Sequence, residues 1–331
     1  MTQFWFAASS EEFPPSQMVE QARAAERAGF DGLGASDHFA PWWPDGQGSQ
    51  AWVTLAAIGQ HTTLPLGTGV TPIINHYHPG VVAQAFMAME ELHPGRVFLG
   101  AGSGEALNEV PLGLDWPESG EMLERFEAGL QAVTRLWDGE TVTMDGGWFR
   151  LKEAKLYTRA ASRPRLYVSA FGPQAAQIAA RYGDGLWTLG DPESAPEVVD
   201  AYLEARARDG RAAGEIILQS GFNLAEDEET AIASTRKWKA TQLEEAYSDD
   251  LHDPAQMLAK AEAEVSDEQF AKEGFIVAAD PSEHVERIRE LEAIHEATTT
   301  IVLQGIGADP LGSIRRYGEH VLPALRSVRA A

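Results

Sequence analysis

The sequence of 331 residues contains no cysteine. This absence excludes disulfide bonds, thiolate metal sites and a cysteine nucleophile. Basic residues are also scarce, because 26 Lys and Arg stand against 50 Asp and Glu, for a formal net charge of −24. Nucleic acids and anionic membranes bind to basic surfaces, so an acidic protein disfavours both. We therefore expect neither nucleic acid nor a membrane as a partner.

Long apolar runs are missing as well, since none reaches the length of about 18 residues that a membrane span needs. No signal peptide precedes the first apolar run, because residues 1–3 lead directly into residues 4–8. We therefore expect a cytoplasmic protein. The sequence also lacks residues spaced as the ligands of a metal ion. His76 and His78 are two residues apart, but no carboxylate stands at the spacing that would complete a ligand set, so the sequence predicts no metal site.

Short apolar segments instead alternate with amphipathic segments along the whole chain. Each apolar segment has the length of a buried strand, and each is followed by a helical pattern. Eight such units without a second core favour a single (β/α)8 TIM barrel over a doubly wound sheet. The predicted strands are residues 4–8, 31–35, 66–70, 96–100, 165–170, 185–188, 215–224 and 298–304.

Two stretches are too long to be ordinary connections of a barrel. Residues 138–157, after the fourth strand, contain Asp145-Gly146-Gly147, which predicts a β-hairpin. Residues 227–293, after the seventh strand, form a charged region with helical patterns that exceeds the length of one helix. We interpret both as insertions in one domain that spans residues 1–331.

The stretch after the second predicted strand carries the most chemistry. It begins with Ser36-Asp37-His38 and continues to Pro41 and Trp42. Imidazole titrates near neutral pH, and an adjacent carboxylate can orient it and raise its basicity. Because active sites of such barrels lie at the carboxyl ends of the strands, His38 is a candidate catalytic residue. The alternative is that Asp37 caps a following helix and that His38 is an ordinary loop residue.

Two other strand ends place small residues ahead of a helix. Ser103 and Gly104 follow the fourth predicted strand, and Ala170 and Gly172 lie at the end of the fifth. Backbone N–H groups at such turns can bind an anion, although glycine also serves turns that bind nothing. Glu105 could hold a proton in an apolar site, or it could merely complement a helix dipole.

With these strand ends identified, the chain resembles the luciferase-like (β/α)8 superfamily of flavin and deazaflavin enzymes. Within that superfamily it is most similar to the coenzyme F420-dependent glucose-6-phosphate dehydrogenase family, over nearly its whole length. The matching stretches are Ser36-Asp-His-Phe-Ala-Pro-Trp42, Gly67-Thr-Gly-Val70, Arg96-Val-Phe-Leu-Gly100, Gly104-Glu-Ala-Leu-Asn-Glu109 and Gly183-Asp-Gly185.

The resemblance implies an oxidoreductase that passes a hydride from a hydroxyl carbon to coenzyme F420. The substrate would be a sugar phosphate similar to glucose-6-phosphate, or a related alcohol. His38 matches the family's general base, and Trp42 matches an aromatic residue that steadies the reacting centre. Glu105 matches a carboxyl group near atom N1 of the ring.

The resemblance also implies which residues bind the coenzyme and the substrate. A non-prolyl cis peptide bond would lie at Gly69–Val70 behind the ring, which Asp37, Thr71 and Asn108 would line. The coenzyme phosphate would lie near Ser103, Gly104, Ala170 and Gly172. The substrate would contact Glu11, Trp42 and Lys260.

One departure from the family affects the substrate. The family's phosphate-binding Lys after the sixth strand is replaced here by an acidic stretch at Asp191. A secondary alcohol or a free sugar therefore remains an alternative substrate for an F420-dependent enzyme. An FMN-dependent monooxygenase and a non-catalytic deazaflavin-binding protein are further alternatives. Members of the family are commonly homodimers, and residues 52–61 and 79–92 are the helices that we expect at such an interface.

Overall fold

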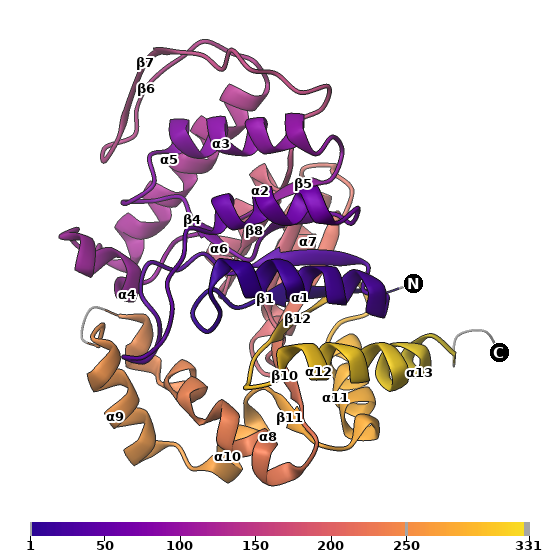
Figure 1. Ribbon diagram of the computed structural model, residues 1–331. Helices are drawn as coiled ribbons and strands as arrows, with labels where there is room; N and C mark the ends of the chain where they lie inside the picture. The colour runs from indigo at the N-terminus through magenta and orange to yellow at the C-terminus, as the bar shows by residue number, and fades with distance from the viewer. Residues whose placement is uncertain (1, 249–250, 328–331) are drawn as a thin grey trace.

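The computed structural model describes residues 2–248 and 251–327 (Figure 1). Eight parallel strands close into a barrel, as the sequence predicts, because the last strand pairs with the first through Phe6 and Leu303. Parallel neighbours cannot be joined by a tight turn, so the connections between successive barrel strands run through helices on the outside of the barrel. In barrel order the strands are β1 (Gln3–Ala8), β2 (Gly32–Ala35), β3 (Leu66–Thr68), β5 (Val97–Gly102), β8 (Arg165–Ser169), β9 (Gly185–Leu189), β10 (Glu215–Leu224) and β12 (Thr300–Gly305).

Aromatic side chains fill the interior of the barrel. Trp5, Phe98 and Trp187 are each at most 3 % exposed, and the Trp5 and Phe98 rings are stacked 5.0 Å apart. Side chains alternate along a strand, so Trp5 points inward while its neighbours on β1 face the helices. The interior of the barrel is therefore filled by side chains, and a ligand site must lie at one end of the barrel.

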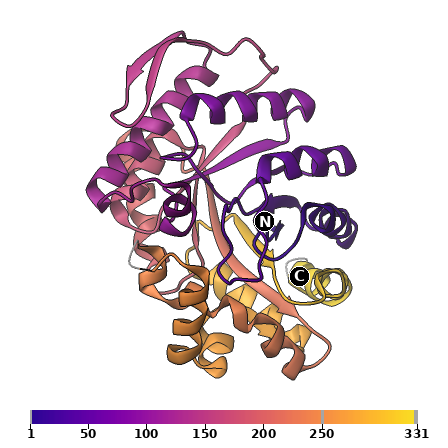
Figure 2. The ribbon, with the colours of Figure 1, turned by 60° about the vertical axis from the view of Figure 1, so that its left-hand side comes forward.

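A ring of helices surrounds the strands (Figure 2). Several of these helices carry Pro in the first turn, where the missing N–H has no intrahelical partner to lose. The helices are α1 (Pro15–Ala28), α2 (Ala51–His61), α3 (Pro79–Leu92), α5 (Ser119–Trp137), α6 (Pro173–Tyr182), α7 (Ala195–Arg208), α11 (Pro281–Ala293), α12 (Pro310–Arg316) and α13 (Leu322–Ser327).

The hairpin predicted within residues 138–157 is present. Strands β6 (Val142–Asp145) and β7 (Arg150–Ala154) pair antiparallel around Gly146-Gly147. The structure places the second strand slightly later than the apolar pattern suggests. Leu151 is buried and fixes the hairpin to the outer helices beside α3 and α5 (Figure 1).

The prediction for residues 227–293 is incomplete. The region contains α8 (Glu228–Thr235), α9 (Pro254–Glu264), α10 (Asp267–Glu273) and two 3-10 turns at Arg236–Gln242 and Glu244–Tyr247. It also contains a strand that the sequence analysis missed, β11 (Ile276–Ala278), which pairs parallel with the end of β10. A strand of three residues is too short to show any periodicity. We call the part from α8 to α10 the covering segment.

The third predicted strand is interrupted rather than continuous over residues 66–70. Strand β3 ends at Thr68, and a second short strand, β4 (Thr71–Pro72), pairs with the end of β5. Between them the peptide bond Gly69–Val70 is cis, as the family resemblance implies.

The close packing of β3 against β5 generates a stability prediction. A Cβ atom at Gly67 would clash with the carbonyl oxygen of Phe98, which is backbone and cannot turn away. We expect Gly67→Ala to lower the free energy of unfolding by about 2 kcal/mol through overpacking. Gly120→Ala is the matched control, because no atom lies within 4 Å of its added Cβ, and it should be neutral or stabilising. Urea unfolding of both variants measures the difference, and equal midpoints would contradict the packing account.

Candidate active site

The ends of three strands at the same rim of the barrel, β1, β2 and β5, bring an imidazole and two carboxylates together. His38 follows β2, Glu11 follows β1, and Glu105 is the N-cap residue of the short helix α4 (Ala106–Glu109) after β5. Carboxyl ends of parallel strands meet at one rim of a barrel, and function concentrates there. The three side chains are 27 to 94 residues apart in the chain, yet they form one group.

His38 lies between the two carboxylates. Its Nε2 atom is 3.5 Å from Oε1 of Glu11 and 3.5 Å from Oε2 of Glu105, and its side chain is 12 % exposed. On the other side of the ring, Nδ1 lies 3.3 Å from the amide nitrogen of Asn108 and 3.4 Å from the carbonyl oxygen of Ala40. The Asn108 amide oxygen accepts hydrogen bonds from the backbone N–H groups of Phe39 and Ala40. Asn108 thus fixes both the loop and the ring.

The charges around His38 change its basicity. Burial alone would lower the pKa of the imidazole, but the negative charges of Glu11, Glu105 and Asp37 outweigh it and raise the pKa above its ordinary value. Burial raises the pKa of the Glu105 carboxyl, and the negative charge of Glu11 adds to this, although His38 opposes it. The group can therefore accept and hold a proton, which is what a general base needs.

Asp37 does not cap a helix. Its carboxylate is buried and accepts hydrogen bonds from the Thr71 hydroxyl at 2.6 Å and the Tyr77 hydroxyl at 3.3 Å. The next helix, α2, is capped by Gln50 instead. Burial raises the pKa of the Asp37 carboxyl. The alternative reading of Asp37 is thus wrong, and the side chain ties β2 to β4.

Aromatic side chains form the wall beside His38. The ring centres of His38 and Trp42 are 5.8 Å apart, and the ring of Tyr247 packs against Trp42 with its centre 5.6 Å away. Burial and, to a smaller extent, the charge of Glu105 raise the pKa of Tyr247, whose hydroxyl donates to the carbonyl oxygen of Thr241. The sequence analysis missed Tyr247, because it stands in a charged segment without any motif.

Behind this group, Val70 packs against the aromatic interior. An added Cβ at Gly69 would lie 2.5 Å from the Trp187 ring, and one at Gly102 would lie 2.5 Å from Cγ2 of Val70. Glycine is therefore required at both positions so that Val70 can sit between the barrel interior and the rim.

Two anion-ready turns lie side by side, because β5 and β8 are neighbouring strands. Gly104 has a positive φ of 85°, and an added Cβ would lie 2.9 Å from the buried carboxylate of Glu109. Glu109 itself pairs with His76 at 3.0 Å. Gly172 is the N-cap residue of α6, makes no side-chain hydrogen bond and has open space beside it. The backbone N–H groups of this turn are therefore available to a phosphate.

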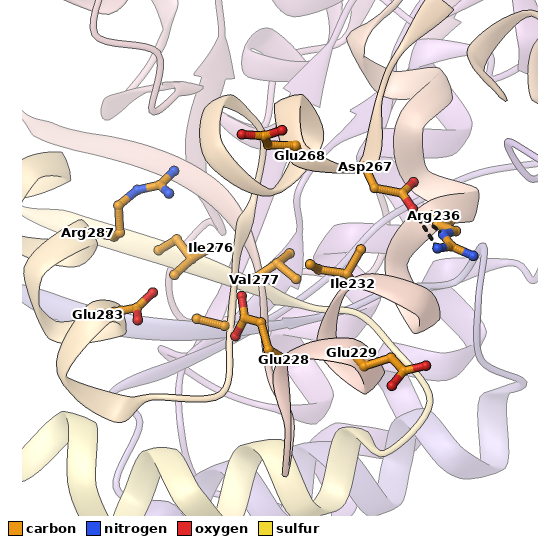
Figure 3. A pocket seen from close by; sticks show the side chains of 11 residues that line it. Glu228, Glu229, Ile232, Arg236, Asp267, Glu268, Ile276, Val277, Glu283 and Arg287 are labelled. Atoms are coloured by element: carbon orange, nitrogen blue, oxygen red, sulfur yellow. Dashed lines mark hydrogen bonds and ion pairs between the residues drawn. The ribbon is translucent and has the colours of Figure 1, made fainter. Parts of the chain in front are cut away.

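Lys260 makes no contact with His38, Glu11 or Glu105. It lies on α9, where its ammonium forms ion pairs with Glu245 at 2.8 Å and Glu264 at 3.8 Å. A separate cavity of about 610 Å³ lies on the far part of the covering segment, between α8, α10, α11 and β11 (Figure 3). It is lined by carboxylates and contains none of the residues around His38.

Within residues 2–248 and 251–327, no group of three or more His, Asp and Glu side chains could hold a metal ion. No helix in that part of the chain is long and apolar enough to cross a membrane.

Comparisons with known proteins agree with this geometry. The family model described as Luciferase-like monooxygenase matches residues 1–295. The F420-dependent glucose-6-phosphate dehydrogenase of Nakamurella multipartita is 38 % identical, over 98 % of this chain and 97 % of that protein. The enzyme of the same name from Microbacterium testaceum is 37 % identical over 98 % and 97 %.

Solved structures extend the comparison. An F420-dependent secondary alcohol dehydrogenase in complex with an F420-acetone adduct has a TM-score of 0.92 at 30 % identity, over 98 % of this chain and 99 % of that chain. The coenzyme F420-dependent tetrahydromethanopterin reductase of Methanopyrus kandleri, at 19 % identity and a TM-score of 0.79, over 98 % and 99 % of the two chains, shares the fold.

The electrostatics of His38 generate a testable prediction. Replacing Glu105 by Gln removes one of the negative charges that raise the pKa of the imidazole, so the His38 pKa should fall. Titration of the imidazole signals by NMR measures this change. His284, which is buried against the Tyr317 hydroxyl outside this group, provides an internal control whose lowered pKa should not change. An unchanged His38 pKa in Glu105→Gln would contradict the electrostatic account.

Proposed function

This chain belongs to the luciferase-like monooxygenase family and, within it, to the F420-dependent glucose-6-phosphate dehydrogenase family, and we propose that it is an F420-dependent dehydrogenase. It acts on CH–OH groups, removing a hydride from a hydroxyl carbon of a sugar phosphate or a related alcohol. The observation that carries the proposal is the His38 imidazole, held between two carboxylates at the rim of the barrel.

The residues at the rim fit a phosphate-bearing coenzyme. The N-terminus of α6 at Gly172 has no side-chain cap and has open space beside it, and the turn at Gly104 lies on the neighbouring strand connection. Ser103 and Ala170 belong to the same two turns. When bound, coenzyme F420 supplies the hydride acceptor.

The ring end of the coenzyme has its own proposed contacts. The proposed contact surface for the ring is the segment from Gly69 and Val70, between β3 and β4, to Thr71 at the start of β4. Asp37, which binds Thr71, and Asn108, which binds the loop after His38, complete it. These residues are the ones that the family resemblance assigns to coenzyme binding. The hydrogen bond from Thr71 to Asp37 and those from the loop after His38 to Asn108 support that assignment, because they hold these side chains in one arrangement.

The side chains around His38 have distinct proposed roles. His38 takes the proton of the substrate hydroxyl, since its raised pKa makes it a stronger base than an isolated imidazole. Glu11 receives a short hydrogen bond from the Ser36 hydroxyl, which fixes its carboxylate opposite Nε2 of His38. Glu105 keeps a second carboxyl at the reacting centre, and Trp42 excludes water from one side.

Two predictions about the whole protein accompany this function. A homodimer through α2 and α3 is supported by Val53, Val81 and Leu92, whose apolar side chains are exposed on these helices. A cytoplasmic location stays a prediction from the sequence.

The role of His38 is tested by replacing it with Ala. We expect His38→Ala to bind oxidised F420 as the unmodified protein does and to lose activity by a factor of about 10²–10⁴, the usual contribution of a general base. In the unmodified protein kcat/KM should rise with pH through the His38 pKa, which lies above 6.5, because only the neutral ring accepts a proton.

His61→Ala, an exposed change in the last turn of α2, is the control and should keep full activity. A parallel titration with FMN separates the two coenzyme classes. Binding of FMN alone would move the chain to the monooxygenase branch, and full activity in His38→Ala would refute the proposed base.

The phosphate turn is tested by Gly104→Ala. The added Cβ meets the buried Glu109 carboxylate and strains a backbone with positive φ, so we expect F420 to bind about tenfold more weakly. Gly113→Ala is a matched control, since Gly113 also has a positive φ of 77° but has no atom within 4 Å of its added Cβ. Fluorescence titration with F420 compares the two. Equal weakening in both variants would show that strain, rather than the turn at Gly104, is responsible.

A further inference from the structure

Negative charge dominates the place where a substrate would meet His38. Glu11, Glu105 and Asp37 all act electrostatically on the imidazole. After the end of β9, Asp191 accepts hydrogen bonds from the Ser194 hydroxyl and from the backbone N–H groups of Glu193 and Ser194. Burial raises the pKa of its carboxyl, but these hydrogen bonds outweigh burial and lower the pKa overall. Glu11, Asp37 and Glu105 match the family whose members are named glucose-6-phosphate dehydrogenases, so the departure that bears on an anionic substrate is Asp191. Such a substrate would need cations to offset that carboxylate.

The cations of the covering segment are already engaged. The Lys237 ammonium lies 2.6 Å from Glu12 and 5.0 Å from the centre of the Trp43 ring. Arg236 and Lys239 both pair with Asp267, and Figure 3 shows the Arg236 guanidinium turned toward that carboxylate. Together with Lys260, which pairs with Glu245, these are all the Lys and Arg side chains that the structure describes within residues 228–273.

Phosphate groups are bound in proteins by Arg, Lys and backbone N–H groups. Here each described cation of the covering segment would first have to leave a carboxylate. Its desolvation and the lost ion pair would then oppose the binding of a phosphate dianion. Repulsive groups of this kind are a common source of specificity against an alternative ligand.

The remaining wall is apolar. Trp42 is 3 % exposed, and Tyr247 packs on it while its hydroxyl donates to the carbonyl oxygen of Thr241. The turn Glu244–Tyr247 lies against α4, the helix that begins after Glu105. The wall beside His38 is therefore built of apolar rings, and the neighbouring carboxylates can accept a hydrogen bond from a hydroxyl group.

We propose that the substrate of this site is an uncharged secondary alcohol and not a phosphate ester, an inference that rests on the proposed F420-dependent dehydrogenase function. The carbinol carbon gives up its hydrogen with the electron pair to F420, which is reduced. The hydroxyl proton passes to His38, and the C–O bond becomes a C=O bond. The product is a ketone from an aliphatic secondary alcohol and a lactone from the ring hydroxyl of a free sugar, and the experiment distinguishes the two substrates.

The experiment first titrates the purified protein with oxidised F420, because failure to bind would overturn the proposed function itself. With F420 bound, the loss of its visible absorbance is followed with 2-propanol, glucose and glucose-6-phosphate. We expect kcat/KM for at least one of the two uncharged compounds to exceed that for glucose-6-phosphate by about tenfold or more. Inorganic phosphate should not compete with the preferred compound.

A higher kcat/KM for glucose-6-phosphate than for both uncharged compounds, or competition by phosphate, would overturn the inference while leaving the dehydrogenase function in place. Turnover of none of the three with F420 bound would instead count against the dehydrogenase function. The two failures are thus distinguishable.

A pair of variants tests the physical cause. Glu245→Gln removes the nearer partner of Lys260, and we expect it to raise kcat/KM for glucose-6-phosphate by about tenfold. Glu264→Gln removes the partner at 3.8 Å and should leave that value unchanged. An unchanged value in both variants would overturn the role assigned to the Glu245–Lys260 ion pair.

Discussion

The ionic contact of His38 with two carboxylates is the interaction on which the rim of this barrel depends. A buried imidazole loses solvation, and only close negative charge makes its protonated form acceptable. Glu11 and Glu105 supply that charge from the ends of β1 and β5. Asn108 and the loop at Ala40 hold the opposite edge of the ring. The position of one side chain thus couples three strand ends.

Most of the fold could be predicted because it follows from alternating local patterns. All eight barrel strands appear where short apolar runs precede amphipathic helices, and the hairpin forms around Gly146-Gly147. The prediction failed where structure depends on tertiary contact. Strand β11 has three residues and no periodicity of its own, so only its pairing with Phe222 to Leu224 makes it a strand.

The site divides in the same way. His38 and Trp42 stand in a recognisable stretch, and the contact between Glu11 and His38 agrees with the roles that the family resemblance implies. Tyr247 could not be found, because its place beside Trp42 is set by how the covering segment folds back. Lys260 was expected at the substrate by its place in the chain. Its ion pair with Glu245 depends on a turn that no spacing reveals.

Strand β10 pairs with both β9 and β11, and this limits how the covering segment can move when a ligand enters the site. Its first half is bonded to β9 and its last three residues to β11, so the covering segment is anchored at its far end to the barrel by main-chain hydrogen bonds. Swinging that segment outward like a hinged flap would break those bonds. The covering segment is therefore tied to the barrel at the end that leads into β11, and substitutions at its side chains can change what fits beside His38 without a change in the barrel.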